Sequence, residues 1–210
     1  VLGAGGNCRD IVDAMCEMNR QSGGTIYHPA GYLDDDPAKH GQRLGCAEVL
    51  GPLSSAASHP NCWFVNGLNG TKLTRRKKEL LAATGIPRER FITIVHPAAS
   101  VSRMARLGVG SVILQNASIC SEAVIGDHAM VLPNSVVSHD AIVGDYSYVT
   151  PGVVLAGYVK LEEAVYMGAR SAVMCRVTIG ARAVVGMGSV VLEDVPADSV
   201  VAGSPARRIK

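Results

Sequence analysis

An aliphatic residue recurs at every sixth position between residues 95 and 195. The register runs without a break through Val95, Val101, Leu107, Ile113, Ile119, Ile125, Val131, Val137, Val143, Val149, Leu155, Leu161, Met167, Val173, Ile179, Val185 and Val191. A second register, four residues later, holds only small residues and valine, from Ala99 to Val195. A period of six fits neither an amphipathic helix nor an alternating strand. The pattern therefore predicts a parallel β-helix of hexapeptide repeats.

In such a β-helix each hexad supplies one short strand and one turn, and we expect three hexads to close one triangular coil. The aliphatic residue should point inward, and coils stacked at about 4.8 Å would give a prism about 25 Å long. A narrow interior agrees with a composition of 48% hydrophobic but only 4% aromatic residues. Glycines that follow the aliphatic residue, such as Gly108 and Gly126, are expected in turns with positive φ. A β-sandwich with chance spacing is disfavoured by the unbroken register.

The residues before the repeat predict a small Rossmann-like α/β domain. We expect Val1 and Leu2 to end a first strand that starts before the numbered chain, followed by a glycine turn and a helix. Residues 25–33 and 61–66 should form two further strands, and residues 72–84 a helix whose basic run 75–78 is a solvated face. The predicted domains are 1–93, for a nucleotide sugar, and 94–210, the β-helix.

Composition narrows the function classes. A net charge of +2 argues against a nucleic-acid partner. The six cysteines form no CxxC motif, so neither a disulfide framework nor a metal site is expected. No run of 18 apolar residues and no secretory signal is found, so we expect a cytoplasmic protein with no membrane partner.

Three groups of residues are candidates for chemistry. His139 and Asp140 are not required by the repeat, and a histidine beside a carboxylate suits a general base near neutral pH. The turn at Gly3, Gly5 and Gly6 precedes a helix and could hold a phosphate, although glycines also serve tight packing. Asp34, Asp35 and Asp36 follow the second predicted strand, where a ribose or base can be bound, or where a solvated turn can lie.

The motifs VLGAGG, GYLDDDPAKHG, HPAASVS, SHDAIVGDYSYVTPGVVLAG and VVGMGSVVLEDVPADSVVAGSPARRIK, in this order, resemble the PglD/NeuD family of bacterial acyltransferases. The resemblance implies a left-handed β-helix and a homotrimer with active sites between adjacent β-helices. It also implies transfer of an acetyl group from acetyl-CoA, without a metal, to the 4-amino group of a UDP-, GDP- or dTDP-linked sugar in surface glycan synthesis. A sialic acid type O-acetyltransferase and a non-catalytic β-helix scaffold remain alternatives.

The resemblance also implies roles for individual residues. His139 matches the catalytic base, Asp140 the acid that orients it, and Gly157 the glycine whose amide contacts the acetyl carbonyl. The positions that match CoA contacts are Gly168, Ala169, Gly186, Met187, Pro205 and Arg207. The positions that match contacts to the nucleotide sugar are Gly3, Gly5, Gly6, Asn7, Asp34, Asp35 and Asp36.

Three positions depart from the family pattern. Asn7 replaces a histidine at the end of the phosphate turn, Leu132 replaces an asparagine, and Tyr148 replaces a histidine that approaches the acetyl group. These departures suggest a different nucleotide or sugar pose, as in the branch that acts on GDP-perosamine.

Overall fold

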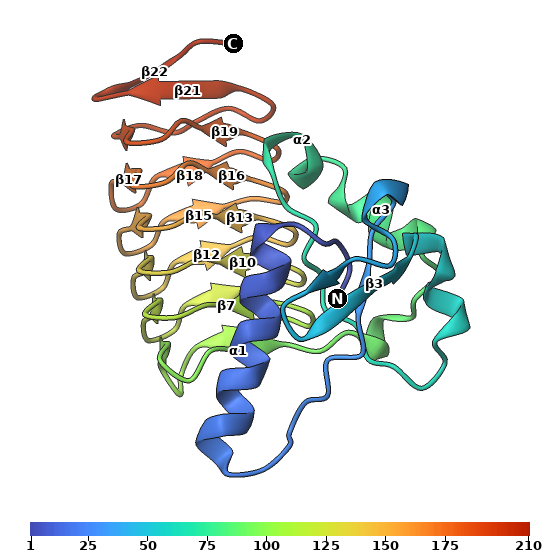
Figure 1. Cartoon of the computed structure of the whole chain (residues 1–210). Helices are drawn as coiled ribbons and strands as arrows, with labels where there is room; N and C mark the ends of the chain where they lie inside the picture. Colours follow the sequence, from blue (N-terminus) through green and yellow to red (C-terminus); the bar gives the residue numbers. More distant parts are fainter.

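The computed structural model describes all residues, 1–210, and consists of a triangular prism of stacked coils with a smaller α/β unit packed against one side (Figure 1). The α/β unit contains α1 (Gly6–Ser22), α2 (Thr71–Thr74) and α3 (Lys77–Ala83). Its strands are β1 (Tyr32–Leu33), β2 (Arg43–Leu44) and β3 (Ala47–Gly51). Three 3₁₀ helices, Pro37–Lys39, Leu53–Ser58 and Arg88–Arg90, connect these elements.

The prism has three parallel sheets, which we name face 1, face 2 and face 3. Face 1 contains β4 (Ile94–Val95), β7 (Val112–Ile113), β10 (Met130–Val131), β13 (Tyr148–Val149), β16 (Tyr166–Met167), β19 (Val184–Val185), β21 (Val200–Gly203) and the antiparallel β22 (Ala206–Arg208). Face 2 contains β5 (Ser100–Val101), β8 (Ser118–Ile119), β11 (Val136–Val137), β14 (Val154–Leu155), β17 (Ala172–Val173) and β20 (Val190–Val191). Face 3 contains β6 (Arg106–Leu107), β9 (Val124–Ile125), β12 (Ile142–Val143), β15 (Lys160–Leu161) and β18 (Thr178–Ile179).

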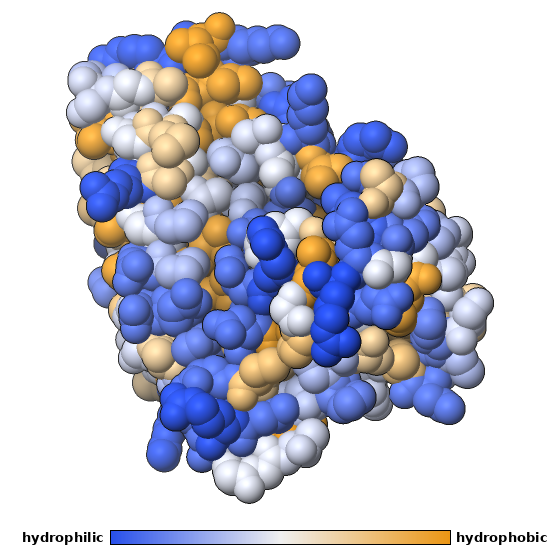
Figure 2. Space-filling view, in the orientation of Figure 1, coloured by the Kyte–Doolittle hydropathy of each residue, from blue (hydrophilic) through white to orange (hydrophobic).

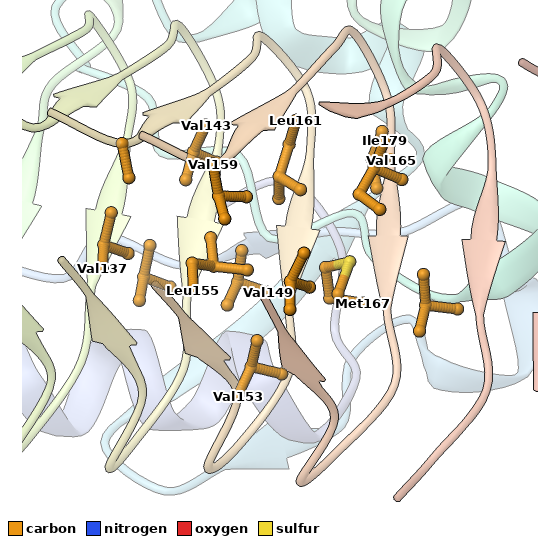
Figure 3. Packing of buried hydrophobic residues seen from close by; sticks show 14 of the residues in the cluster. Val137, Val143, Val149, Val153, Leu155, Val159, Leu161, Val165, Met167 and Ile179 are labelled. Carbon is orange, nitrogen blue, oxygen red and sulfur yellow. The ribbon is translucent and has the colours of Figure 1, made fainter. Parts of the chain in front are cut away.

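Each coil contains three hexads, as the repeat predicts. Val137 pairs with Ile119 on one side and with Leu155 on the other, eighteen residues away in each direction. The inward aliphatic and small residues form one core cluster of 25 buried side chains, none of them aromatic (Figure 3). Successive coils therefore place equivalent turns directly above one another at corners 1–2, 2–3 and 3–1, named by the faces they join.

The prediction that the glycines after the aliphatic residues have positive φ is wrong. Positive φ occurs three positions after the aliphatic residue instead, for example at Asn116, Glu122 and Asp140. A Cβ on Gly126 would lie 2.5 Å from the backbone nitrogen of Asp145 in the next coil. Glycine is required at these positions because adjacent coils approach closely.

The α/β unit has fewer regular strands than the sequence predicts. Of residues 25–33 only β1 is a strand, because the Asn19 side chain accepts the amides of Ile26 (2.7 Å) and Tyr27 (2.8 Å). Of residues 61–66 only Phe64 and Asn66 form β-bridges. Leu2 lies between Leu33 and Asn66 in parallel pairing, so a short parallel sheet does form.

The predicted helix 72–84 is interrupted. The amide of Arg76 donates to the carbonyl of Leu73, one residue closer than in an α-helix, and this separates α2 from α3. The basic run is a solvated face only in part, since Arg75, Arg76 and Lys78 are exposed but Lys77 at the start of α3 is fully buried. Lys78 pairs with Glu163 of the β-helix at 3.0 Å.

Helix α1 joins the two parts of the molecule. Ile11, Ala14 and Met15 pack against the outer side of face 1, while Cys8 and Val12 pack against the small sheet. The first turn of α1 is thereby fixed between the sheet and the β-helix. None of the three α-helices combines the length and hydrophobicity that a membrane span requires.

Candidate active site

His139 and Asp140 lie in the turn between β11 and β12, at corner 2–3. The Asp140 Oδ2 lies 2.9 Å from Nδ1 of His139, and the imidazole ring packs edge-on against Tyr158 at 5.3 Å. The guanidinium of Arg176 lies 4.5 Å from the Tyr158 ring centre. The His139 side chain is 55% exposed, and Nε2 has no hydrogen-bond partner in the chain. Asp140 thus holds the ring through Nδ1, and Nε2 of His139 faces outward, where it can accept a proton.

Gly157 lies one coil beyond His139 at the same corner. A Cβ at this position would meet Nε2 of His139 at 2.7 Å, so glycine leaves room for the imidazole ring. The Gly157 amide donates to no group of the chain. The structure therefore brings together His139, Asp140 and Gly157, with a free amide beside the imidazole.

The residues that match CoA contacts gather at corner 1–2. A Cβ on Gly168 would lie 2.5 Å from the backbone nitrogen of Met187, so the two predicted turns are stacked. The C-terminal hairpin joins them, because the amide of Gly203 donates to Ser189 Oγ at 3.2 Å. The Met187 side chain is 75% exposed. Hydrophobic side chains are visible on this end of the prism, whereas the α/β unit is mainly hydrophilic (Figure 2).

The residues that match sugar-nucleotide contacts lie where the strands of the small sheet end. Gly3 has a φ of +92°, and a Cβ there would meet the Cys8 sulfur at 3.0 Å. Gly5 and Gly6 have nothing within 4 Å of a Cβ position, so packing does not require glycine there. Gly5 precedes α1 and supplies no side-chain cap. The N-terminal amides of α1 are thereby left available to an anion.

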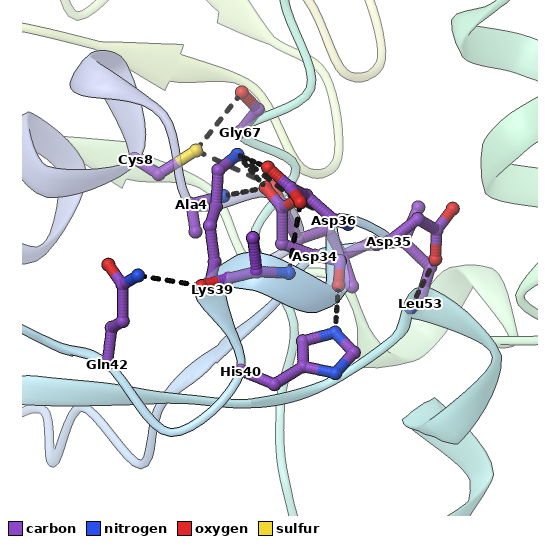
Figure 4. Close-up of polar contacts among 12 residues, drawn as sticks. Ala4, Cys8, Asp34, Asp35, Asp36, Lys39, His40, Gln42, Leu53 and Gly67 are labelled. Carbon is purple, nitrogen blue, oxygen red and sulfur yellow. Dashed lines mark hydrogen bonds and ion pairs between the residues drawn. The ribbon is translucent and has the colours of Figure 1, made fainter.

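Of the three consecutive aspartates, two face this edge and one does not (Figure 4). Asp34 Oδ2 accepts the amide of Ala4 at 2.7 Å and pairs with Lys39 at 3.1 Å. Burial opposes ionisation of Asp34, but the Asp36 amide, Lys39 and the Ala4 amide outweigh it and hold its pKa below the usual value. Asp35 instead accepts the amide of Leu53 at 2.8 Å, so its carboxylate braces the following 3₁₀ helix.

Two of the departures from the family pattern contact each other. The Asn7 side chain donates a hydrogen bond to the Tyr148 hydroxyl. Leu132, the third departure, is buried in the contact between α1 and face 1. Lys77 also reaches this region, with its ammonium 5.9 Å from the Tyr148 ring centre. Lys77 is not among the predicted site residues, because nothing in four consecutive basic residues indicates that one of them turns inward.

An apolar cavity lies away from these groups. It has a volume of about 560 Å³ and is lined mainly by apolar residues, including Val1, Gly31 and Trp63. It lies at the opposite ends of the strands and contains none of the predicted site residues. No group of three or more His, Cys, Asp or Glu side chains gathers as a metal site.

The candidate residues thus form three groups on different sides of one chain. His139 and Gly157 are at corner 2–3, the Gly168 and Gly186 turns are at corner 1–2, and the α/β edge lies against face 1. A single prism separates these groups.

Comparison with protein families identifies the repeat. Residues 122–157 match the model "Bacterial transferase hexapeptide (six repeats)". A 2,3,4,5-tetrahydropyridine-2,6-dicarboxylate N-acetyltransferase of Clostridium perfringens is 52% identical over 50 residues, 24% of this chain and 21% of that protein. Serine acetyltransferase 2 of Arabidopsis thaliana is 47% identical over 51 residues, 24% of this chain and 16% of that protein. The matches thus span about a fifth of these relatives.

Solved structures match the whole chain. The acetyltransferase domain of PglB from Neisseria gonorrhoeae superposes with a TM-score of 0.85 and 26% identity, covering 99% of this chain and 97% of that one. PerB from Caulobacter crescentus, in complex with CoA and GDP-perosamine, gives 0.82 and 28%, covering 100% and 95%. These matches confirm the predicted fold, a Rossmann-like unit followed by a left-handed parallel β-helix.

Proposed function

We propose that this chain, which has the fold and motif order of the PglD/NeuD family of bacterial sugar acyltransferases, is an acetyl-CoA-dependent N-acetyltransferase acting on the 4-amino group of a nucleotide-linked sugar. The observation that carries the proposal is the His139–Asp140 pair beside Gly157. The full-length match to PerB, solved with CoA and GDP-perosamine, supports the substrate class. We place the product in the synthesis of a bacterial surface glycan.

In the proposed reaction the sugar amine attacks the thioester carbonyl of acetyl-CoA directly. His139 Nε2 accepts the proton that the amine loses, and Asp140 on Nδ1 orients the ring and stabilises the imidazolium. The Gly157 amide donates to the oxyanion of the tetrahedral adduct. The adduct then collapses to the amide and releases the CoA thiolate, which is protonated. Both substrates are held in one cleft, so proximity supplies much of the acceleration.

The remaining contacts are assigned by position. Gly168, Ala169, Gly186 and Met187, with Pro205 and Arg207, would hold CoA at corner 1–2. Gly3, Gly5, Gly6, Asn7, Asp34 and Asp36 would hold the nucleotide sugar at the α/β edge. Asp35 is the exception, because its carboxylate is engaged with Leu53 inside the domain.

We infer a homotrimer, because the three groups of site residues meet only if one chain's corner 2–3 approaches another chain's corner 1–2 and α/β edge. The outer side of face 2, next to His139, supports this arrangement. Val136, Val154, Ala172 and Val190 point outward there, and Val154 is 42% exposed. An apolar strip of this kind on a sheet face fits a second copy of the chain.

The proposal is tested by thiol release from acetyl-CoA with a panel of UDP-, GDP- and dTDP-linked 4-amino sugars. The variant His139→Ala should lower kcat by roughly 10²–10⁴-fold, the usual scale of a general base, and leave acetyl-CoA affinity unchanged. Unchanged kcat with a raised KM for acetyl-CoA would contradict the base assignment. Acetylation of a free sugar acid, with no turnover of nucleotide sugars, would replace the N-acetyltransferase by an O-acetyltransferase.

A further inference from the structure

Lys77 is the only fully buried side chain among the lysines, arginines, aspartates and glutamates of the chain. Its ammonium donates to Asn69 Oδ1 at 2.7 Å and has no carboxylate within ion-pair distance. An ammonium buried without a counter-charge is costly, and a methionine would fill the same space at lower cost. Packing alone therefore does not account for a lysine at this position.

The place of Lys77 suggests its partner. Asn69 belongs to the loop that follows Asn66, at the same edge of the sheet as the glycine turn. The Lys77 ammonium also lies beside the ring of Tyr148, whose hydroxyl accepts from Asn7 in the first turn of α1. The 17-residue helix α1 starts there without a side-chain cap and without an acidic residue in its first turn.

A second buried group at this edge lacks a partner. Asn66 is 2% exposed, and its Oδ1 accepts the amide of Leu68, which turns the side chain toward the loop that carries Asn69. Its Nδ2 has no hydrogen-bond acceptor in the chain. All three groups at this edge favour an anion as ligand. They are the unpaired Asn66 amide donor, the uncapped start of α1 and the Lys77 ammonium without a carboxylate.

We propose that Lys77 supplies the counter-charge for the diphosphate of the nucleotide sugar at this edge, and that binding of the diphosphate is coupled to uptake of a proton by Lys77. This inference rests on the proposed function, which places a nucleotide sugar at the α/β edge. Lys77 contacts Asn69 and the Tyr148 ring, and Tyr148 in turn contacts Asn7 in the first turn of α1. It determines the affinity for the anionic part of the substrate rather than the chemistry at His139.

The direction of the proton coupling follows from the surroundings of Lys77. Burial lowers the pKa of Lys77 to about 7, so a large fraction is neutral above this pH. A nearby diphosphate favours the charged form and raises the pKa, so binding at pH 8 should take up protons. Well below pH 7, by a unit or more, the lysine is already charged and uptake should vanish.

The groups near Lys77 whose pKa is shifted by burial titrate outside this range. From the β-helix, burial raises the pKa of Tyr148 to about 12 and lowers that of His128 to about 4. On α1, burial raises the pKa of Cys8 to about 11, and Asp10 is exposed. The loop 66–70 carries no ionisable side chain. Proton uptake near pH 8 would therefore report on Lys77.

The test is titration calorimetry of the full chain with UDP, GDP and dTDP at pH 8, in two buffers of different ionisation enthalpy. At this pH the terminal phosphate is already ionised, because its pKa is about 6. The variants are Lys77→Met and, as matched control, Lys78→Met, which removes the same charge from the exposed neighbour on α3. The thermal midpoint of each unliganded variant shows whether it is folded.

We expect the wild type and Lys78→Met to take up a fraction of a proton per nucleotide and Lys77→Met to take up none. Lys77→Met should also weaken binding about 10- to 100-fold, the scale of a hydrogen bond to a charged group. Equal affinity and equal proton uptake in wild type and Lys77→Met would overturn the inference and leave the proposed function intact. Failure of the wild type to bind any of the three nucleotides would overturn both.

Discussion

At the scale of single residues, the geometry of the candidate site depends on the absence of a side chain at Gly157. Gly157 permits His139 to lie directly against its Cα, because a Cβ would come within 2.6 Å of the ring carbon Cε1. The obstacle is a side chain rather than backbone, and the His139 side chain is half exposed and free to turn away. A small change at Gly157 should therefore act on the reaction and spare the fold.

We predict that Gly157→Ala lowers kcat about 10²-fold, the usual consequence of misplacing a catalytic group by about 1 Å. The alanine keeps the backbone amide, so the loss reports the displaced imidazole and not a missing oxyanion donor. Steady-state kinetics with saturating acetyl-CoA measure it, and thermal unfolding should stay close to that of the wild type. A variant with normal kcat would show that the imidazole does not need its present position.

Residue chemistry singled out His139 and the family resemblance added Gly157 to the predicted site, but neither pointed to Lys77. Helical periodicity assigns a residue to a face only if the helix is continuous, and the break at Arg76 changes which basic residue turns inward. The Asn7–Tyr148 contact was equally hidden, since it joins positions 141 residues apart. Contacts of that range depend on how the α/β unit docks on face 1, which no local pattern encodes.

At the scale of elements, the backbones of adjacent coils in the β-helix approach each other closely at the glycine positions. A Cβ on Gly126 would meet the Asp145 backbone nitrogen at 2.5 Å, and one on Gly144 would meet the Glu162 carbonyl oxygen at 2.4 Å. Backbone atoms cannot turn aside as a side chain can. The register of hydrophobic residues thus predicts the coil, but the spacing between coils determines where glycine is needed.

We predict that Gly126→Ala lowers the free energy of unfolding by about 1–3 kcal/mol, the scale of an overpacked core. Urea unfolding followed by circular dichroism measures this change. Gly157→Ala provides the matched comparison, because it adds the same methyl group at a turn where the neighbour is a side chain. Its loss of unfolding free energy should be smaller than that of Gly126→Ala. If the two variants lose the same stability, close approach of the coils is not the reason for these glycines.

His128 lies between the aromatic rings of Phe91 and Tyr146. Its ring lies 4.6 Å from the Phe91 ring and 5.5 Å from that of Tyr146, and its Nδ1 has no partner. Burial lowers the pKa of His128 from 6.5 to about 4. The unfolded chain therefore binds more protons than the folded chain between these values, and stability contributed by neutral His128 is lost as pH falls from 6.5 toward 4.

Replacing His128 by Phe should remove this acid sensitivity. Between pH 7 and pH 4.5 the wild type should lose on the order of 2 kcal/mol more free energy of unfolding than His128→Phe. Urea unfolding of both proteins at the two pH values measures the difference, in which the other titrating groups cancel. Parallel losses would show that protonated His128 is accommodated without cost.

At the scale of the whole molecule, the coil period determines which predicted residues can meet. His139 and Gly157 are eighteen residues apart, as are Ala169 and Met187, so each pair stacks at one corner. The interval between Gly157 and Gly168 is not a multiple of eighteen, and the two pairs lie at different corners. The spacing along the sequence therefore already indicates that the proposed base and the proposed CoA turns lie at different corners. The spacing does not predict the position of the α/β edge, because that position depends on how α1 docks on face 1.

This separation predicts complementation between two inactive variants. His139→Ala removes the proposed base, and Gly6→Trp covers the proposed nucleotide edge at a position where nothing lies within 4 Å of a Cβ. If each cleft combines His139 of one copy with the α/β edge of the next, any trimer that contains both variants has one intact cleft of three. Doubly tagged mixed trimers should then recover about a third of the wild-type rate, as cyclic symmetry requires. If the complete site lay within one chain, every subunit would carry a defect and the mixed trimers would stay as inactive as either parent.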